Sequence, residues 1–145
     1  MMLGTYITNS PEGTNELAAK VAQGIAIGTV VALIGDLGTG KTAFTQGFAK
    51  AMEISESVGS PTFKLVSEYM GKEYWLYHID CYRLKNAQQF INIGGEEYLT
   101  PDIGIAIIEW ADIIEEILPT NTIMINFKRI IGKPNHREII ISEKL

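Results

Sequence analysis

The segment Gly35–Thr42 reads Gly-Asp-Leu-Gly-Thr-Gly-Lys-Thr, a glycine followed after four residues by Gly-Lys-Thr. Glycines let the backbone turn tightly with consecutive N–H groups pointing inward, and such a nest binds an anion. In this motif the lysine, here Lys41, contacts the β- and γ-phosphates of a nucleotide, and the hydroxyl of Thr42 binds Mg²⁺. The spacing therefore predicts a nucleoside triphosphate site. Its expected contacts are Leu37, Gly38, Thr39, Gly40, Lys41, Thr42 and Ala43.

The sequence on either side of this loop has the character that the motif requires. Residues 29–34 are a continuous β-branched and aliphatic run, which is typical of a buried parallel strand. Residues 43–52 are expected to form a helix. A helix that begins at the loop adds its unpaired N–H groups and the positive end of its dipole to the phosphate site. This context argues against a chance glycine-rich turn.

A second apolar strand ends in a carboxylate at Glu109, directly before Trp110. Proteins with this phosphate loop place an acid at the end of such a strand, where it holds Mg²⁺ from the side opposite the loop threonine. We therefore expect Glu109 to act as a metal ligand with Thr42 and as a catalytic residue. Glu109 could reach the metal through a water molecule, or it could polarise the attacking water. The alternative is a solvated acid at a strand end.

The segment His78–Arg83 combines several chemically active side chains on one strand. Alternation along a strand places His78, Asp80 and Tyr82 on the same face. Asp80 is a catalytic candidate that either binds Mg²⁺ indirectly or orients the attacking water. Arg83 is a candidate for contact with the γ-phosphate or with a partner. The alternative for this segment is a polar strand edge with a surface pair between Asp80 and Arg83.

A third candidate, Thr62, lies in the segment Ser60–Phe63 between the loop helix and the next strand. Pro61 stiffens this connection. In nucleotide switches the same region carries a threonine whose hydroxyl senses Mg²⁺ and the γ-phosphate, so we expect Thr62 to contact the nucleotide. A plain turn is the alternative.

Apolar periodicity and turn residues predict the elements that position these side chains. The expected strands are 5–7, 29–34, 63–70, 72–79, 104–108, 122–127 and 137–142. The expected helices are 10–25, 43–52, 86–99 with a break at Gly94-Gly95, and 112–118. This order predicts an α/β fold with a mixed sheet flanked by helices, in which a parallel nucleotide-binding core is extended by antiparallel strands. We expect residues 1–145 to form a single P-loop domain.

The composition limits the function classes that fit. The 145 residues carry 12 Lys and Arg against 17 Asp and Glu, a net charge of −5, whereas binding to a nucleic acid backbone requires clustered cations. Any RNA is therefore expected to be held by another protein. No apolar run approaches the roughly 20 residues that span a membrane. A single cysteine, Cys81, suits a reducing cytoplasm.

The ordered set of motifs resembles the TsaE (YjeE) family over nearly the whole chain. The matching segments are GDLGTGKT at 35–42, SPTF at 60–63, HIDCYRL at 78–84, GGEEYL at 94–99 and IEW at 108–110. The resemblance implies a P-loop ATPase that uses ATP, ADP and Mg²⁺, with Lys41, Asp80 and Glu109 in the catalytic site. It also suggests that residues 10–14 close the base site, with Glu12 as a contact.

The same resemblance implies dependence on a partner complex. The family works with a TsaB-type subunit and a TsaD-type transferase, which place a threonylcarbamoyl group on the adenosine 3′ of the tRNA anticodon. Hydrolysis of ATP by the TsaE-type subunit supports turnover of that complex, and tRNA is contacted only through the partners. The acidic charge balance of the chain agrees with this division of labour.

Two other functions compete with this interpretation. A small-molecule or nucleotide kinase requires an acceptor pocket and usually an Arg-rich mobile lid, whereas the only arginines here are Arg83, Arg129 and Arg137. An ATP-dependent assembly factor with negligible hydrolysis differs from a TsaE-type ATPase only in degree. Comparing the ATPase activity of the chain alone and with candidate partners distinguishes these possibilities.

Overall fold

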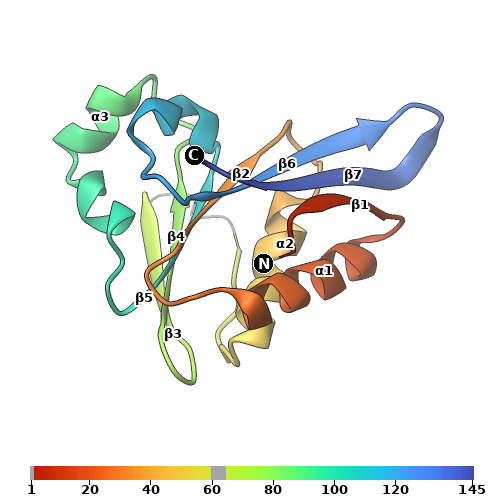
Figure 1. The fold of residues 1–145 in the computed structure, drawn as a ribbon, viewed down its shortest axis with the longest axis horizontal. Coiled ribbons are helices and arrows are strands. Elements are labelled where there is room, and N and C mark those ends of the chain that lie inside the picture. The colour runs from red at the N-terminus through yellow and green to blue at the C-terminus, as the bar shows by residue number, and fades with distance from the viewer. Residues whose placement is uncertain (1, 60–64) are drawn as a thin grey trace.

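The computed structural model describes residues 2–59 and 65–145, and within these ranges seven strands form one sheet (Figure 1). The strands are β1 (Gly4–Thr8), β2 (Val30–Ile34), β3 (Val66–Met70), β4 (Trp75–Asp80), β5 (Gly104–Glu109), β6 (Ile123–Ile130) and β7 (Lys133–Glu143). The helices are α1 (Pro11–Gly24), α2 (Lys41–Ala51) and α3 (Ala87–Asn92), with 3₁₀ helices η1 (Gly95–Leu99) and η2 (Ala111–Ile117).

The strand order across the sheet is β1-β7-β6-β2-β5-β4-β3. Strand β2 pairs in parallel with both β5 and β6, and β4 pairs in parallel with β5. The outer pairs β1/β7, β6/β7 and β3/β4 are antiparallel. The predicted mixed sheet, a parallel core with antiparallel additions, is therefore confirmed.

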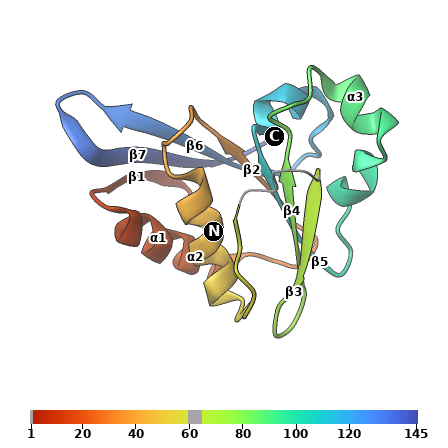
Figure 2. The same ribbon diagram turned by 180° about the vertical axis from the view of Figure 1, so that it is seen from behind.

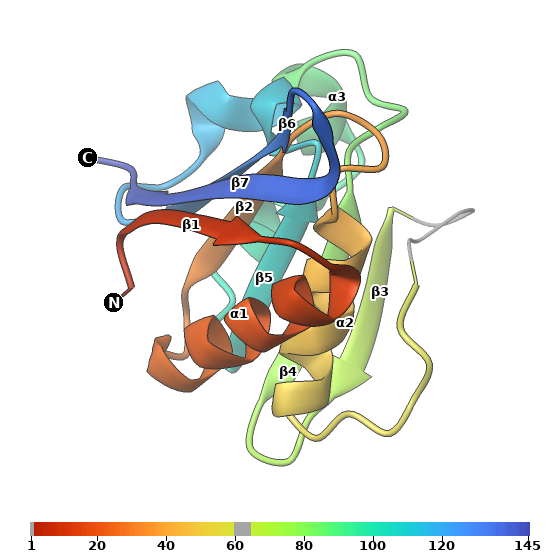
Figure 3. The ribbon, with the colours of Figure 1, turned by 90° about the vertical axis from the view of Figure 1, so that its right-hand side faces the viewer.

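Helices cover both faces of this sheet (Figures 1 and 2). One apolar cluster joins α1 and α2 to alternate residues of the central strands, and it includes Leu33, Phe44 and Ile107. A second cluster joins α3 and η2 to the opposite residues of the same strands, including Ala32 and Ile108. Figure 3 shows α1 beside α2 beneath the antiparallel pair β1/β7. Alternation along β2 and β5 thus fills two cores, as continuous apolar runs in parallel strands predict.

The two helices on the nucleotide-loop side approach each other closely at Gly47. A Cβ atom added at Gly47 would lie 2.6 Å from both the Cα and the carbonyl oxygen of Asn15 in α1. Helix α1 is fixed at its own start by the hydroxyl of Ser10, which accepts a hydrogen bond of 3.0 Å from the Gly13 N–H. Ser10 is therefore the N-cap of α1.

Several predicted boundaries differ from the structure. Strand β4 begins at Trp75 rather than at Lys72, because the Lys72 N–H donates to the Met52 carbonyl at the end of α2. The predicted helix 112–118 is a 3₁₀ segment, whose Ile114 has non-helical angles. Strands β6 and β7 are longer than predicted and meet at a two-residue turn, since residues 133–136 continue β7. Thr62 lies outside the described residues.

Within the described ranges, no helix has both the length and the apolar character needed to cross a membrane.

The break predicted at Gly94-Gly95 is confirmed, because α3 ends at Asn92 and η1 starts at Gly95.

The contact at Gly47 gives a stability prediction. Gly47→Ala is expected to lower the free energy of unfolding by about 1–3 kcal/mol, because the new methyl group collides with the backbone of α1. Gly24→Ala is the matched control. Among the described residues, no atom outside the adjoining backbone of α1 lies within 4 Å of a Cβ built there, and alanine favours the helix by at most about 1 kcal/mol. Urea denaturation of both variants measures the difference, and equal stabilities would contradict the proposed close contact.

Candidate nucleotide-binding site

The candidate residues meet at one edge of the sheet because their strands are parallel. Strand β2 leads into the phosphate loop, and its Leu33 pairs with Glu109 at the end of β5. On the other side of β5, Glu109 pairs with Asp80 at the end of β4. Ligand sites of open α/β sheets lie at the carboxyl ends of such strands. The sheet register therefore places the loop, Glu109 and Asp80 side by side.

The phosphate loop leads into α2 with an N-terminus shaped for an anion. Gly40, the residue before α2, has φ of +109°, a left-handed conformation that favours glycine. The hydroxyl of Ser10 caps α1 and the side chain of Asn86 caps α3, whereas no described side chain caps the start of α2. The first turn of α2 also contains no acid. Its N–H groups and dipole are thus arranged to bind negative charge.

Two arginines of the β6–β7 hairpin hold this loop from outside. The guanidinium of Arg129 donates to the carbonyl of Leu37, and that of Arg137 donates to the carbonyl of Gly38 at 3.2 Å. These arginines lie directly opposite each other across the two strands. Sequence analysis missed this role, because the contacts span more than 90 residues and no local pattern signals them.

Lys41 is buried in the first turn of α2. Its ammonium group donates to the carbonyl of Gly35 and, at 3.3 Å, to that of Asp36, and it lies 3.9 Å from the ring centroid of Trp110. Burial lowers the pKa of Lys41, and the nearby carboxylates, with Glu109 foremost, act in the opposite direction. The charge of Lys41 is therefore partly shielded from water and is surrounded by carboxylates.

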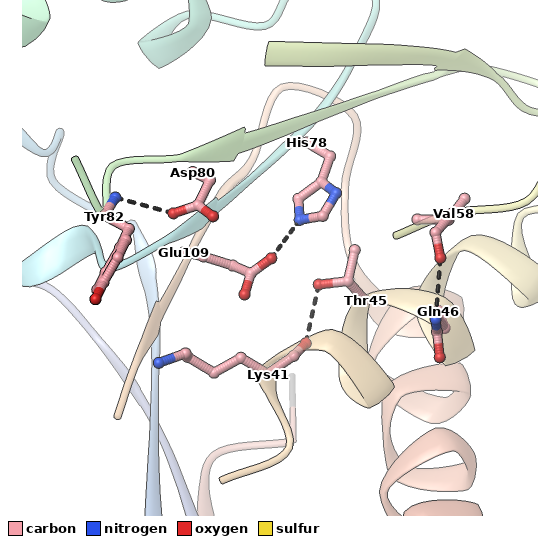
Figure 4. A network of polar contacts seen from close by, with 8 residues as sticks. All are labelled: Lys41, Thr45, Gln46, Val58, His78, Asp80, Tyr82 and Glu109. Atoms are coloured by element: carbon pink, nitrogen blue, oxygen red, sulfur yellow. Dashed lines mark hydrogen bonds and ion pairs between the residues drawn. The ribbon is translucent and has the colours of Figure 1, made fainter. Parts of the chain in front are cut away.

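Glu109 is only 3% exposed and is paired with a buried histidine. Its Oε2 lies 2.6 Å from Nε2 of His78, whose side chain is fully buried on β4 (Figure 4). The alternative interpretation, in which Glu109 is a solvated acid at the end of a strand, is therefore wrong. Sequence alternation placed His78 on the correct face but did not reveal its partner.

Asp80 lies at the end of β4 on the same side as Glu109 and Lys41 (Figure 4). Its Oδ1 accepts a hydrogen bond of 2.9 Å from the Tyr82 N–H. Burial raises the pKa of Asp80, that hydrogen bond lowers it, and Glu109 raises it further. Asp80 and Arg83 form no ion pair, although both residues are described. The predicted shared face is confirmed for His78 and Asp80, and Tyr82 packs its ring 5.0 Å from that of Trp110.

A cavity of about 400 Å³ connects these groups. It is lined by Leu37, Gly38, Gly40, Lys41, Thr42, Ala43, Asp80, Tyr82, Glu109 and Trp110. A smaller cavity of about 150 Å³ lies against the loop as well. Its lining is Ser10, Pro11, Thr14, Gly38, Gly40, Ala43, Asn135 and Arg137. Six of the seven predicted loop contacts therefore line the larger cavity.

Two other predicted contacts lie elsewhere. The buried hydroxyl of Thr39 donates to the Asp36 carbonyl at 2.7 Å, which stabilises the turn of the loop. Glu12 is exposed in the first turn of α1, next to residues that line the smaller cavity but not among them.

The oxygen donors around the larger cavity fit Mg²⁺. The described residues include no group of three or more His, Cys, Asp and Glu side chains that could hold a metal by themselves. Mg²⁺ prefers oxygen ligands and is commonly held by one or two carboxylates together with substrate phosphates. Thr42, Asp80 and Glu109 supply a hydroxyl and two carboxylates on one cavity. This donor set suits a cation that arrives with a nucleotide.

Comparison with known proteins agrees with the motifs. Residues 8–139 match the family described as threonylcarbamoyl adenosine biosynthesis protein TsaE. The chain belongs to the TsaE family. The tRNA threonylcarbamoyladenosine biosynthesis protein TsaE of Bacillus subtilis is 41% identical over 122 residues, which cover 84% of this chain and 75% of that protein. The protein of the same name from Treponema pallidum is 35% identical over 136 residues, covering 94% and 98%.

A solved crystal structure superimposes on most of the chain. The crystal structure of Bacillus subtilis YdiB has a TM-score of 0.80 and 36% identity, and the match covers 96% of this chain and 84% of that one. The predicted membership of the TsaE family is thus confirmed. TsaE membership and the P-loop fold together imply nucleotide binding.

The pKa of Asp80 gives a prediction for stability. Because burial raises the folded-state pKa above its ordinary value of 3.8, the folded protein binds the proton more tightly than the unfolded chain does. Stability is therefore lost as the pH rises from 3.8 through the folded-state pKa. Asp80→Asn keeps an oxygen for the Tyr82 N–H and should raise the melting temperature at pH 7 by up to about 4 °C.

The difference between Asp80→Asn and the unsubstituted protein should approach zero well below pH 3.8, where the aspartate is protonated in both states. Thermal denaturation followed by circular dichroism over a pH series measures it. Asp102→Asn, in the exposed loop before β5, is the control for a generic change of charge. A less stable Asp80→Asn at pH 7 would mean that attraction to Lys41 outweighs the cost of burial.

Proposed function

We propose that this TsaE-family protein binds and hydrolyses ATP with Mg²⁺, and that hydrolysis supports threonylcarbamoyl transfer to tRNA. The observation that carries the proposal is the single cavity where Lys41 and Thr42, at the start of α2, face Asp80 and Glu109 at the ends of two parallel strands. Phosphoryl transfer requires this combination of a phosphate cradle, a cation and a group that positions water.

Lys41 and the N–H groups of the loop bind the β- and γ-phosphates in this proposal. The hydroxyl of Thr42 and the carboxylate of Glu109 hold the cation, which neutralises charge that develops on the phosphates. Without positive charge between them, the two carboxylates would repel a triphosphate. The buried position of Glu109 excludes water from one side of the site, and this strengthens its electrostatic interactions.

The hydrogen bonds of the two carboxylates suggest different roles for them. Glu109 has one oxygen engaged by His78 and the other available to the cavity. Asp80 uses Oδ1 for the Tyr82 N–H, so its second oxygen is available to orient the attacking water or to bind a water ligand of the cation. A carboxyl whose pKa is raised by burial also suits proton transfer better than a fully solvated one.

We assign the smaller cavity to the nucleoside end of the ligand. It shares Gly38, Gly40 and Ala43 with the larger cavity, so the two lie on either side of one loop. Its remaining lining offers hydroxyls from Ser10 and Thr14 and polar groups from the β6–β7 hairpin. The predicted base contact then shifts from Glu12 toward Ser10 and Thr14, with Glu12 at the rim.

The partner of this ATPase is proposed to be a TsaB-type subunit with a TsaD-type transferase, acting in the cytoplasm. The names of the relatives place those proteins in tRNA threonylcarbamoyladenosine biosynthesis. A net charge of −5 disfavours direct contact with a tRNA backbone. Transfer onto tRNA therefore falls to the partners, while this chain supplies the cycle of ATP binding and hydrolysis.

Lys41→Ala is expected to abolish measurable ATP binding, because the loop loses its only buried cation while the carboxylates of the site remain. Isothermal titration calorimetry with ATP and Mg²⁺ measures the affinity. Lys50→Ala, which removes an exposed lysine from the last turn of the same helix, is the control and should bind normally. Unchanged affinity in Lys41→Ala would show that the loop is not the phosphate site.

Asp80→Ala is expected to keep the ATP affinity within a few-fold and to lower turnover by roughly 10²-fold or more, as expected for the loss of water positioning. Phosphate release is measured with and without the TsaB and TsaD partners, together with multiple-turnover tRNA modification. Asp102→Ala controls for the loss of a carboxylate outside the site. Full turnover of Asp80→Ala in both assays would remove Asp80 from the mechanism.

A further inference from the structure

His78 is a fully buried imidazole on β4, between the buried Leu76 and the strand-end Asp80 on the same face, and it lies opposite the buried Ile107 of β5. Its Nε2 lies 2.6 Å from Oε2 of Glu109, and its Nδ1 is buried without a hydrogen-bond partner among the described residues. Glu109 is therefore its one hydrogen-bond partner within the described part of the chain. A buried polar pair costs desolvation free energy that an apolar side chain of similar size would avoid.

The geometry shows what this hydrogen bond does to Glu109. His78 lies opposite Ile107 in the parallel register, so its ring reaches along the sheet face to the side chain two residues further along β5. Because a carboxylate only accepts hydrogen bonds, an ionised Glu109 requires Nε2 to carry the hydrogen. One oxygen of Glu109 is then fixed by the ring, and the carboxylate is held in one orientation at the cavity that also contains Lys41, Thr42 and Asp80.

We propose that His78 is a positioning residue, which orients the Glu109 carboxylate toward a cation bound with the nucleotide. This inference rests on the proposed function, because it assigns a role within the same site. Hydrogen-bond partners of metal-binding carboxylates typically contribute 10- to 100-fold to metal affinity. His78 contacts neither the nucleotide nor the cation in this proposal and acts only through Glu109.

The test measures Mg²⁺ binding rather than activity. Mg²⁺ is titrated calorimetrically into the protein saturated with a non-hydrolysable ATP analogue. His78→Leu keeps an apolar side chain in the core but removes the donor, and it should weaken Mg²⁺ binding roughly 10- to 100-fold. His78→Gln can place an amide N–H near the position of Nε2 and should recover part of the loss. Affinity for the analogue in EDTA should remain within two- to three-fold of the unsubstituted protein.

Leu76→Ala is the matched control for a general disturbance of the strand. Leu76 is fully buried on the same strand and face as His78, two residues earlier. Its truncation should lower the melting temperature but leave Mg²⁺ affinity unchanged. If Leu76→Ala weakens Mg²⁺ binding as much as His78→Leu does, the effect of His78 is structural and the inference is overturned.

Nuclear magnetic resonance of the imidazole nitrogens provides a second readout that needs no ligand. The expected result is a His78 ring protonated at Nε2, with a signature that changes in Glu109→Ala, and His136→Gln assigns the signals because the chain has two histidines. A ring protonated only at Nδ1 would contradict the proposed hydrogen bond.

The Mg²⁺ titration of Glu109→Ala separates the two hypotheses. Weak Mg²⁺ binding in both Glu109→Ala and His78→Leu supports the positioning role. Weak binding in Glu109→Ala but normal binding in His78→Leu rejects the positioning role and leaves the proposed function intact. Normal binding in both variants rejects the metal role of Glu109 and, with it, the inference.

Discussion

The parallel pairing of β5 with both β2 and β4 is the constraint on which the site depends. It brings three strand ends to one edge of the sheet, where the first leads into the phosphate loop and the others carry Glu109 and Asp80. A shift of β4 by one residue would turn Asp80 and His78 to the opposite face, toward the core beneath α3. The apolar residues that fill both cores therefore also hold the strand register that brings the proposed catalytic carboxylates together.

The loop itself depends on distant parts of the fold. Arg129 and Arg137 belong to the β6–β7 hairpin, more than 90 residues further along the chain, yet they donate to consecutive carbonyls of the loop. Two like charges opposite each other across antiparallel strands normally repel. Here each guanidinium is satisfied by a loop carbonyl, so the hairpin and the loop stabilise one another. The smaller cavity is lined by residues of the loop, of the hairpin and of the start of α1.

Local sequence patterns predicted the parts of the site that lie within single elements. The glycine spacing of the loop, the acid that ends β5 and the shared face of His78 and Asp80 each follow from a few consecutive residues. The partner of Glu109 could not be predicted, because 31 residues separate it from His78 and their contact depends on the strand register. The start of β4 was also misplaced, since the Lys72 N–H bonds to the end of a distant helix.

The electrostatics of the site explain why stability and ligand binding are linked. Burial lowers the pKa of Lys41 and raises that of Asp80, so both charged forms are less favourable in the folded protein than in water. Phosphates placed at the lysine and a cation placed at the carboxylates would offset both penalties. A ligand that binds only the folded state adds its binding free energy to stability. Lys41 and Asp80 therefore lower the stability of the folded protein when the site is empty. The same two side chains are those through which a nucleotide and its cation would raise that stability.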